Sequence, residues 1–249
     1  MVRLFLAGMM TLAGVGAAQA APVTELVTNG SFEASSYTVN HEFSTRAGTP
    51  TVGNPATTQG VTGWTGTGFA LYFLAGTQAT TPAITEFKDN QNYLRSNVTL
   101  SPDGGNFVAL DGDGSFQGGT GASVSQTIGG LTVGIQYDVS FDWAAAQLQN
   151  KTGDTTEQLK VQFGSSIQYT SVVKNPSAGF SGWLQQQFRF TATSASEVLS
   201  FLSVGTPTGL PPIALLDGVS VKQAVPEPAS LALLGVGLLG LCGMVRRRA

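Results

Sequence analysis

Stretches in which large apolar and polar side chains alternate one by one place the strongest limit on the fold of this chain. The clearest covers residues 137–143, where Tyr, Val, Phe and Trp alternate with Asp, Ser and Asp. Successive residues of a β-strand point to opposite faces of a sheet, so this period of two predicts a strand with one buried face. No window has the sustained apolar period of 3.6 that a helix packed on a core requires.

The same alternation recurs through the middle of the chain. Strands are predicted at 107–111, 122–128, 137–143, 159–163, 184–190, 199–201 and 219–221. Many short strands between turn residues are typical of an antiparallel β-sandwich or jelly roll, in which the apolar faces of two sheets pack together. We therefore predict one all-β domain over residues 21–222, with a long loop at 37–60, where alternation is absent.

Composition excludes several classes of function for this domain. Residues 21–222 hold eight Lys and Arg against fourteen Asp and Glu, a net charge of −6, whereas nucleic acid requires clustered cations. The only cysteine, Cys242, lies outside the domain, and His41 is the only histidine, so a disulfide and a Cys/His zinc site are excluded. A Ser/His/Asp triad would have one possible base and no nucleophile motif beside it. Asp138 and Asp142, on one face of a predicted strand, keep a glycoside hydrolase as a third alternative.

The first twenty residues have the three parts of a secretory signal peptide. Arg3 precedes an apolar stretch at 4–15, and the small residues Ala18 and Ala20 form a cleavage site. The apolar stretch is too short to span a bilayer. An uncleaved amphipathic helix is the alternative, but the segment has no charged face. We therefore predict cleavage after Ala20.

Residues 223–249 contain a motif, an apolar run and a basic end in that order. The motif and the basic end consist of Pro226, Glu227 and Pro228, and of Arg246, Arg247 and Arg248. The uncharged run between them, 229–245, would extend about 26 Å as a helix, near the lower limit for crossing a membrane. Arginines beyond it favour the cytoplasmic side. These residues predict a transmembrane helix that leaves the β domain outside the cell.

This arrangement resembles the PEP-CTERM sorting signal of Gram-negative bacteria. The resemblance implies recognition by an exosortase, a membrane-embedded cysteine protease that cuts near the PEP motif at 226–228. It also implies passage through the secretion machinery, a stay in the inner membrane before processing, and association with exopolysaccharide export at the cell surface or in a biofilm. An ordinary single-pass anchor is the alternative. The tail is an address and implies no activity of the domain.

A second resemblance spans nearly the whole domain. The motifs are LVTNGSFE at 26–33, GW at 63–64, FVALDG at 107–112, VSQTI at 124–128, YDVSF at 137–141 and LDGVSV at 216–221. Their order is similar to galactose-binding-like jelly rolls, including a plant cell-wall family of unknown function and several bacterial carbohydrate-binding modules. In such modules the Glu of the first motif and the Asp of the last commonly hold a structural calcium ion, which implies Glu33 and Asp217 here. Alternatively, Glu33 caps a turn and Asp217 binds backbone amides.

Exposed aromatic side chains are the candidate sugar-binding positions, because an aromatic ring offers a flat apolar surface. Trp183 is expected to point outward, since it alternates with the apolar residues of 184–190, and Tyr72 and Tyr93 lie in less regular segments. Trp64 and Trp143 are expected in the core. Together, the residues and resemblances predict a non-catalytic, carbohydrate-associated surface protein. The alternative is a structural or adhesive matrix protein without a specific sugar site.

Overall fold

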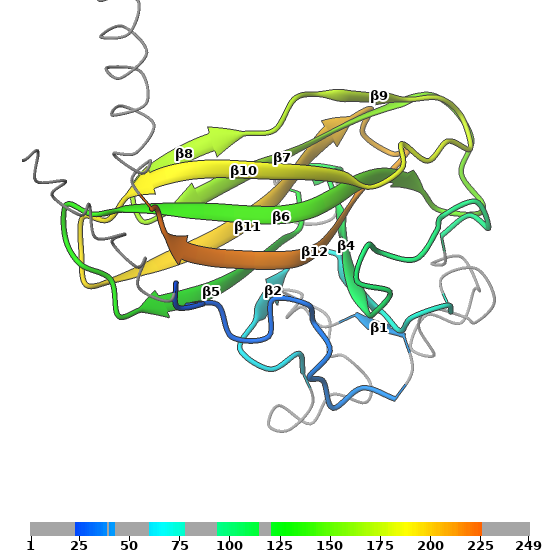
Figure 1. Ribbon diagram of the computed structural model, residues 1–249. Helices are drawn as coiled ribbons and strands as arrows, with labels where there is room; N and C mark the ends of the chain where they lie inside the picture. The colour runs from blue at the N-terminus through cyan, green and yellow to red at the C-terminus, as the bar shows by residue number, and fades with distance from the viewer. Residues whose placement is uncertain (1–22, 39, 43–59, 78–93, 115–120, 226–249) are drawn as a thin grey trace, which may run out of the picture.

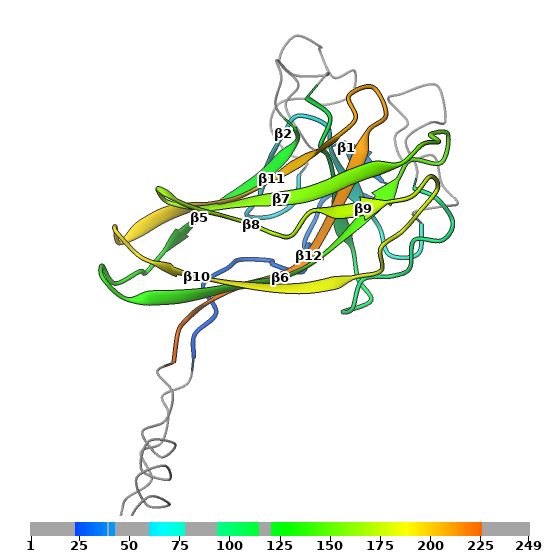
Figure 2. The same cartoon turned by 90° about the horizontal axis from the view of Figure 1, so that it is seen from above.

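The computed structural model describes residues 23–38, 40–42, 60–77, 94–114 and 121–225 (Figure 1). These residues form two antiparallel sheets without an α-helix, and Figure 2 shows the sheets as two layers. The predicted all-β sandwich is therefore confirmed. None of the described segments contains a helix long and apolar enough to cross a bilayer, and the predicted signal peptide and transmembrane run lie outside them.

Each sheet is built from strands that are distant in sequence. The first has the order β1 (His41–Glu42), β3 (Ala70–Phe73), β4 (Phe107–Asp111), β12 (Pro212–Gln223), β6 (Gln136–Gln147) and β10 (Leu184–Thr191). The second has the order β2 (Thr65–Thr67), β5 (Ser123–Gly129), β11 (Ser196–Thr206), β7 (Thr155–Phe163) and β8 (Ser166–Tyr169), and β9 (Val173–Asn175) also pairs with β7. All seven predicted strands are present. Of the predicted loop at 37–60, residues 41–42 form β1, and 43–59 lie outside the described residues.

The main core lies between the sheets and contains the apolar members of the alternating strands. The rings of Phe141 and Phe201, one from each sheet, meet edge to face with centroids 5.0 Å apart. Trp64 and Trp143 are buried in the same core, as predicted. The period of two thus places one side of each strand against the opposite sheet.

A second apolar cluster covers the outer face of the first sheet where β3, β4, β12 and β6 meet. It contains Phe69, Leu71, Phe73, Leu94, Val98, Phe107, Ala109, Ala144, Ala146, Leu148, Ile213 and Leu215. Because these strands are covered on both faces, β4 is buried throughout and so is β12 from Pro212 to Asp217. Strands buried on both faces lose alternation. The sequence pattern therefore missed the first half of β12 and the end of β6.

The opening segment of the domain joins the last strand. The backbone amide of Leu26 donates to the Val221 carbonyl at 3.0 Å, and the amide of Val219 donates to the Gly30 carbonyl at 2.9 Å. A Cβ atom at Gly30 would lie 1.8 Å from the Val219 oxygen, so only glycine permits this approach. The two ends of the domain are therefore side by side.

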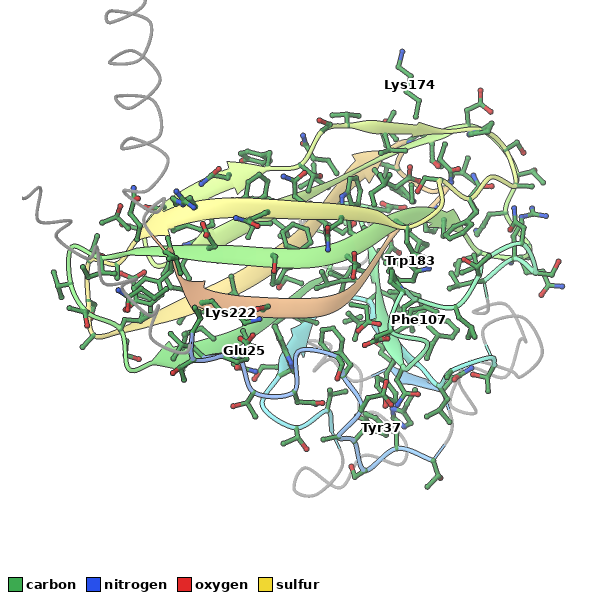
Figure 3. All side chains as sticks on the ribbon, viewed as in Figure 1. Glu25, Tyr37, Phe107, Lys174, Trp183 and Lys222 are labelled. Carbon is green, nitrogen blue, oxygen red and sulfur yellow. The ribbon has the colours of Figure 1, made fainter. Side chains whose placement is uncertain are left out.

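Glu25 fastens this junction and was not singled out in the sequence. Its Oε1 accepts hydrogen bonds from the amides of Val27 and Val221 at 2.9 Å each, and its Oε2 lies 3.6 Å from the Lys222 ammonium (Figure 3). Burial opposes ionisation, but the hydrogen bonds from Ser220 and these amides, with the charge of Lys222, outweigh it and lower the pKa of Glu25. The carboxylate thus holds the two chain ends together in its charged form.

One end of the core between the sheets is polar. Glu157 of β7 is fully buried, and its Oε1 accepts a hydrogen bond from Thr155 at 2.5 Å. Its Oε2 and the Oδ1 of the adjacent Asn175 have no hydrogen-bond partner. Burial raises the pKa of Glu157 to about 7.

This burial predicts that the folded domain loses stability as the pH rises from about 4.5 to about 7. The folded state binds a proton at Glu157 across this window and the unfolded state does not, so the slope is at most about 1.4 kcal/mol per pH unit. Glu157→Gln keeps the shape and removes the titration. Urea unfolding at pH 5 and pH 7.5 should show that the wild type loses stability relative to this variant. Identical pH dependence in the two proteins would contradict the assignment.

Candidate functional site

Trp183 lies on the outer face of the first sheet, directly before β10, and does not join the core between the sheets. Its ring meets the edge of Phe107 with centroids 5.6 Å apart, and its indole N–H donates to the Thr99 carbonyl at 3.3 Å (Figure 3). It is partly buried against the second apolar cluster. The predicted outward direction is therefore correct, but the ring packs over the sheet and supports the segment around Thr99.

Tyr72 is wrong as a candidate for stacking on sugars. Its side chain is fully buried, and its hydroxyl donates to the Phe32 carbonyl at 3.1 Å. β3 lies between β1 and β4, and both of its faces are covered, because Ala70 and Tyr72 belong to the main core while Leu71 and Phe73 belong to the second apolar cluster. Tyr72 thus holds the opening motif in place and offers no ring face to a ligand. Tyr93 lies outside the described residues.

The predicted calcium residues differ in their surroundings. Glu33 is exposed, and both of its oxygens accept hydrogen bonds from Asn106, one from the backbone amide and one from the side chain. Asp217 is 1% exposed; its Oδ1 accepts from the Gly218 amide at 2.7 Å, and its Oδ2 has no hydrogen-bond partner. Burial and the nearby Asp103 carboxylate raise the pKa of Asp217 to about 8.

Asp103 is the member of this acidic group that the sequence did not reveal. Asp103 lies beside Asp217, although the two residues are far apart in the sequence. Its carboxylate accepts hydrogen bonds from the Ser101 hydroxyl and the Gly105 amide. Its charge also raises the pKa of Asp142, after burial as the larger cause. In the described part of the chain, none of these carboxylates pairs with Lys or Arg, and no group of three or more acidic, His or Cys side chains could hold a metal ion.

The outer face of the second sheet carries two rows of side chains that run across the strands. The strand registers place Thr65, Ser125, Ser200, Gln162 and Ile167 in one row, and Thr67, Ser123, Leu202, Lys160 and Tyr169 in the next. Residues directly opposite each other on paired strands share a face. We call these ten residues, with their neighbours Thr127, Val198 and Val204, the hydroxyl face. Five strands span about 19 Å at the usual spacing.

The hydroxyl face carries no carboxylate. Within β2, β5, β7, β8 and β11 the only acidic residues are Glu157 and Glu197, and both are buried. Lys160 supplies its one charge, whereas Asp103, Asp138 and Asp142 belong to the side of the first sheet. Apart from Lys160, this face offers hydroxyl, amide, aliphatic and phenol groups.

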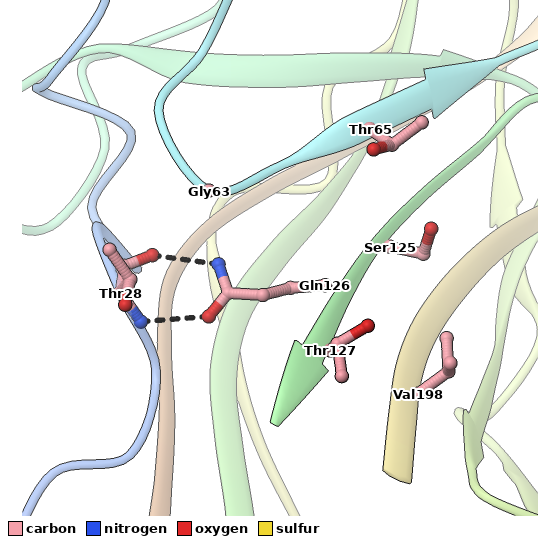
Figure 4. A pocket seen from close by; sticks show the side chains of 7 residues that line it. All are labelled: Thr28, Gly63, Thr65, Ser125, Gln126, Thr127 and Val198. Carbon is pink, nitrogen blue, oxygen red and sulfur yellow. Dashed lines mark hydrogen bonds between the residues drawn. The ribbon is translucent and has the colours of Figure 1, made fainter. Parts of the chain in front are cut away.

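A shallow pocket of about 390 Å³ opens at one edge of the hydroxyl face (Figure 4). It is lined by Thr28, Gly63, Thr65, Ser125, Gln126, Thr127 and Val198. Gln126 shapes its wall, because its side chain donates to the Thr28 carbonyl and accepts from the Thr28 amide, both at 2.8 Å. The pocket has the volume of a small-molecule site and an uncharged polar lining. The sequence alternation predicted that Ser125 and Thr127 point outward. It could not predict that they lie beside Thr65, because that depends on the pairing of β2 with β5.

The carboxylates of β6 do not fit the geometry of glycoside hydrolysis. Asp138 is held by a two-point ion pair with Arg189, at 2.7 and 2.9 Å. Asp142 lies four residues farther along the strand, about 13 Å by strand rise, whereas the two carboxyl groups of a glycosidase lie about 5–9.5 Å apart. His41 stacks on Tyr37 with ring centroids 4.3 Å apart.

Two sequence families match the chain. Residues 92–222 match the family described as protein of unknown function (DUF642), and residues 224–248 match the PEP-CTERM protein-sorting motif. The second match contains the predicted Pro226, Glu227, Pro228 and Arg246–Arg248, which lie outside the described residues. The predicted sorting signal is therefore confirmed at the level of sequence. No curated protein matches the chain.

Several solved structures are similar in fold. TmCBM61 in complex with beta-1,4-galactotriose is 14% identical, with a TM-score of 0.42 over 81% of this chain and 99% of that one. The CBM22-1 xylan-binding domain of Paenibacillus barcinonensis Xyn10C is 13% identical, with a TM-score of 0.38 over 84% and 100%. The K1 cleaved adhesin domain of Lys-gingipain from Porphyromonas gingivalis W83 is 13% identical, with a TM-score of 0.38 over 75% and 98%.

The paired hydrogen bonds of Gln126 predict that Gln126→Ala destabilises the domain. The substitution leaves the amide and the carbonyl of Thr28 without partners, which should lower the free energy of unfolding by about 2 kcal/mol. Thr127→Ala, at an exposed position of the same strand, is the matched control and should stay within about 0.5 kcal/mol of the wild type. Urea denaturation measures both. Equal effects would show that Gln126 does not hold the Thr28 segment.

Proposed function

The chain belongs to the DUF642 family, and we propose that this member is an exported, non-catalytic surface protein that binds polysaccharide on the hydroxyl face. The PEP-CTERM motif implies export and processing by an exosortase, so that the domain ends at the cell surface or outside the cell. We further propose that the run at 229–245 anchors the chain in the inner membrane until that cut. The released domain would then associate with extracellular polysaccharide.

The absence of carboxylates from the hydroxyl face, together with the pocket at its edge, is the observation that carries this proposal. Sugar hydroxyl groups exchange hydrogen bonds with Ser and Thr hydroxyls and with Gln amides without requiring a charge on either side. Most of the pocket's side-chain oxygens are hydroxyls that can serve as donor or acceptor, including those of Thr65, Ser125 and Thr127. A polymer that offers many weakly polar groups in a row therefore fits this surface better than a compact charged ligand does.

Apolar contacts on the same face support a polymer ligand. Tyr169 is 52% exposed at the β8 edge, and Val198 is 50% exposed beside the pocket. The C–H faces of sugar rings can pack on such side chains. The sequence had predicted this stacking role for Trp183, Tyr72 and Tyr93. Lys160 lies in the same row as Tyr169, so the face also tolerates an acidic sugar.

A glycan array and affinity electrophoresis with residues 21–225 test the proposal. Ser125→Tyr fills the pocket and should weaken binding at least tenfold, whereas the same substitution on the outer face of the first sheet, Ser140→Tyr, should change it less than twofold. Circular dichroism and melting curves establish that both variants fold. Equal binding by both would move the site away from the hydroxyl face.

The two alternatives predict other outcomes of the same experiment. A structural or adhesive matrix protein without a sugar site would bind none of the glycans, with or without calcium, and that result would overturn the proposal. A glycoside hydrolase would shorten the polysaccharides, which chromatography of the incubated samples would reveal.

We also propose that a calcium ion is held at the outer face by Glu33 and Asp217, with backbone carbonyls and water as its other ligands. The supporting observation is the buried Oδ2 of Asp217, which has no hydrogen-bond partner and lies beside the Asp103 carboxylate. Calcium takes carboxylate and carbonyl oxygens in flexible geometry, so the two carboxylates do not have to supply all of its ligands. When bound, the ion would supply the positive charge that this acidic group lacks.

Chelation tests this calcium site. At a calcium concentration a hundred times the Kd, the ion would add about 2.7 kcal/mol, so a chelator should lower the Tm by about 5–10 °C. Asp217→Asn should abolish the response, whereas Asp154→Asn, an exposed control, should retain it. An unchanged Tm of the wild type with chelator would contradict calcium binding.

A further inference from the structure

The two ends of the described chain and one turn form a single corner of the sandwich. The Ala224 amide donates to the Gln136 carbonyl at 2.9 Å, directly after the turn at 130–135. In the same corner the 25–26 segment lies along β12, and Leu26 packs near Gly130. We call residues 23–25, 130–135 and 222–225 the terminal corner.

The terminal corner presents exposed valines at its surface. Val133 at the turn is 62% exposed, Val225 is 51% exposed and Val23 is 42% exposed. All three belong to the most exposed large apolar side chains of the described residues. The corner's charged residues, Glu25 and Lys222, pair with each other (Figure 3). The surface is therefore apolar at its tips and carries no unbalanced charge.

The sorting tail begins immediately beyond this corner. Only residues 226–228 separate Val225 from the apolar run at 229–245, and three extended residues reach about 10 Å at most. The run, about 26 Å long as a helix, needs nearly all its length to cross a hydrocarbon core of about 30 Å. While the run is in the membrane, Val225 must therefore lie at the level of the lipid headgroups.

We propose that, before the tail is cut, the terminal corner docks on the phospholipid bilayer and the hydroxyl face points away from it. This inference rests on the proposed membrane anchoring of the run at 229–245. Figure 2 shows the two ends leaving together from the layer of the first sheet, on the side away from the second sheet. The short spacer limits how far the domain can turn, and the valines enter the headgroup layer. The anchored protein thus keeps its polymer-binding face open to the outside.

A bilayer fits the corner better than a second protein does. The three valines lie on separate short segments and form isolated apolar tips, whereas a protein partner requires a continuous buried area. Lipid headgroups accommodate small apolar side chains next to a paired charge, and the tail supplies the anchoring energy. The bilayer is also within reach of the corner by the length of the chain between Val225 and the apolar run.

Spin labels on the full chain in vesicles test this orientation. Cys242→Ser removes the only cysteine, and Val133→Cys or Val204→Cys then places one nitroxide on the terminal corner or on the hydroxyl face. The chain is reconstituted in vesicles of phosphatidylethanolamine and phosphatidylglycerol. Relaxation by oxygen, which enters lipid, is compared with relaxation by a water-soluble nickel chelate. We expect the oxygen-to-nickel ratio at position 133 to be at least threefold higher than at position 204.

Two controls separate this inference from the anchoring on which it rests. Flotation with the vesicles reports anchoring, and a chain that fails to float overturns both proposals. A chain that floats but gives equal ratios at positions 133 and 204 overturns only the docking. The same labels on a chain ending at residue 225 should both give the ratio of water-exposed sites, because three valines do not hold the domain on lipid without the tail.

Discussion

The pairing of β12 on both sides is the interaction on which the rest of the structure depends. β12 pairs with β6 along nearly its whole length, while its other edge meets β4 first and the opening segment afterwards. At Gly218 the register shifts, and the left-handed backbone there (φ 59°) lets the strand pass from one partner to the other. This one strand joins the first and last residues of the domain, so a chain without disulfides closes on itself through backbone hydrogen bonds and the Glu25 carboxylate.

The same pairing separates the two outer faces of the sandwich chemically. The first sheet contains the chain ends, the packed segment 94–106 and the carboxylates around Asp217, so its outer face is covered, acidic or close to the tail. The second sheet lacks all of these, and its acids, Glu157 and Glu197, turn inward. What remains outside is a flat surface of hydroxyl, amide and aliphatic groups. A domain anchored by one corner would therefore present the face without carboxylates to the surroundings and keep its acidic face near the cell.

Several motif residues prove to be structural. The side-chain amide of Asn29 donates to the Thr62 and Ala34 carbonyls, and the backbone carbonyl of Asn29 accepts from the Trp64 indole. The ring of Phe32 packs at a tilt against Trp64, with centroids 5.0 Å apart. The ordered motifs that carry the resemblance thus explain how the chain ends and the first strands fit together. They do not identify the proposed binding surface, because only Ser125 and Thr127 of the hydroxyl face belong to a motif, VSQTI at 124–128. The resemblance therefore predicted the fold and did not locate the proposed site.

The sequence by itself determined the class of fold, most of the single-faced strands and the sorting tail. Alternation depends only on local residue order, and the tail is a linear signal, so neither requires knowledge of the partner strands. Tertiary structure alone decided the strand neighbours, and with them three results: Tyr72 is buried, Asp103 joins Asp217, and Thr65 lies beside Ser125 across two sequence-distant strands. The pattern failed in the first half of β12 and at the end of β6, because both faces of these segments are covered and buried residues no longer alternate with exposed ones. The hydroxyl face is formed by residues from five strands, so its composition depends on the register in which these strands pair. That register is set by hydrogen bonds between residues distant in the sequence, which local residue order does not reveal.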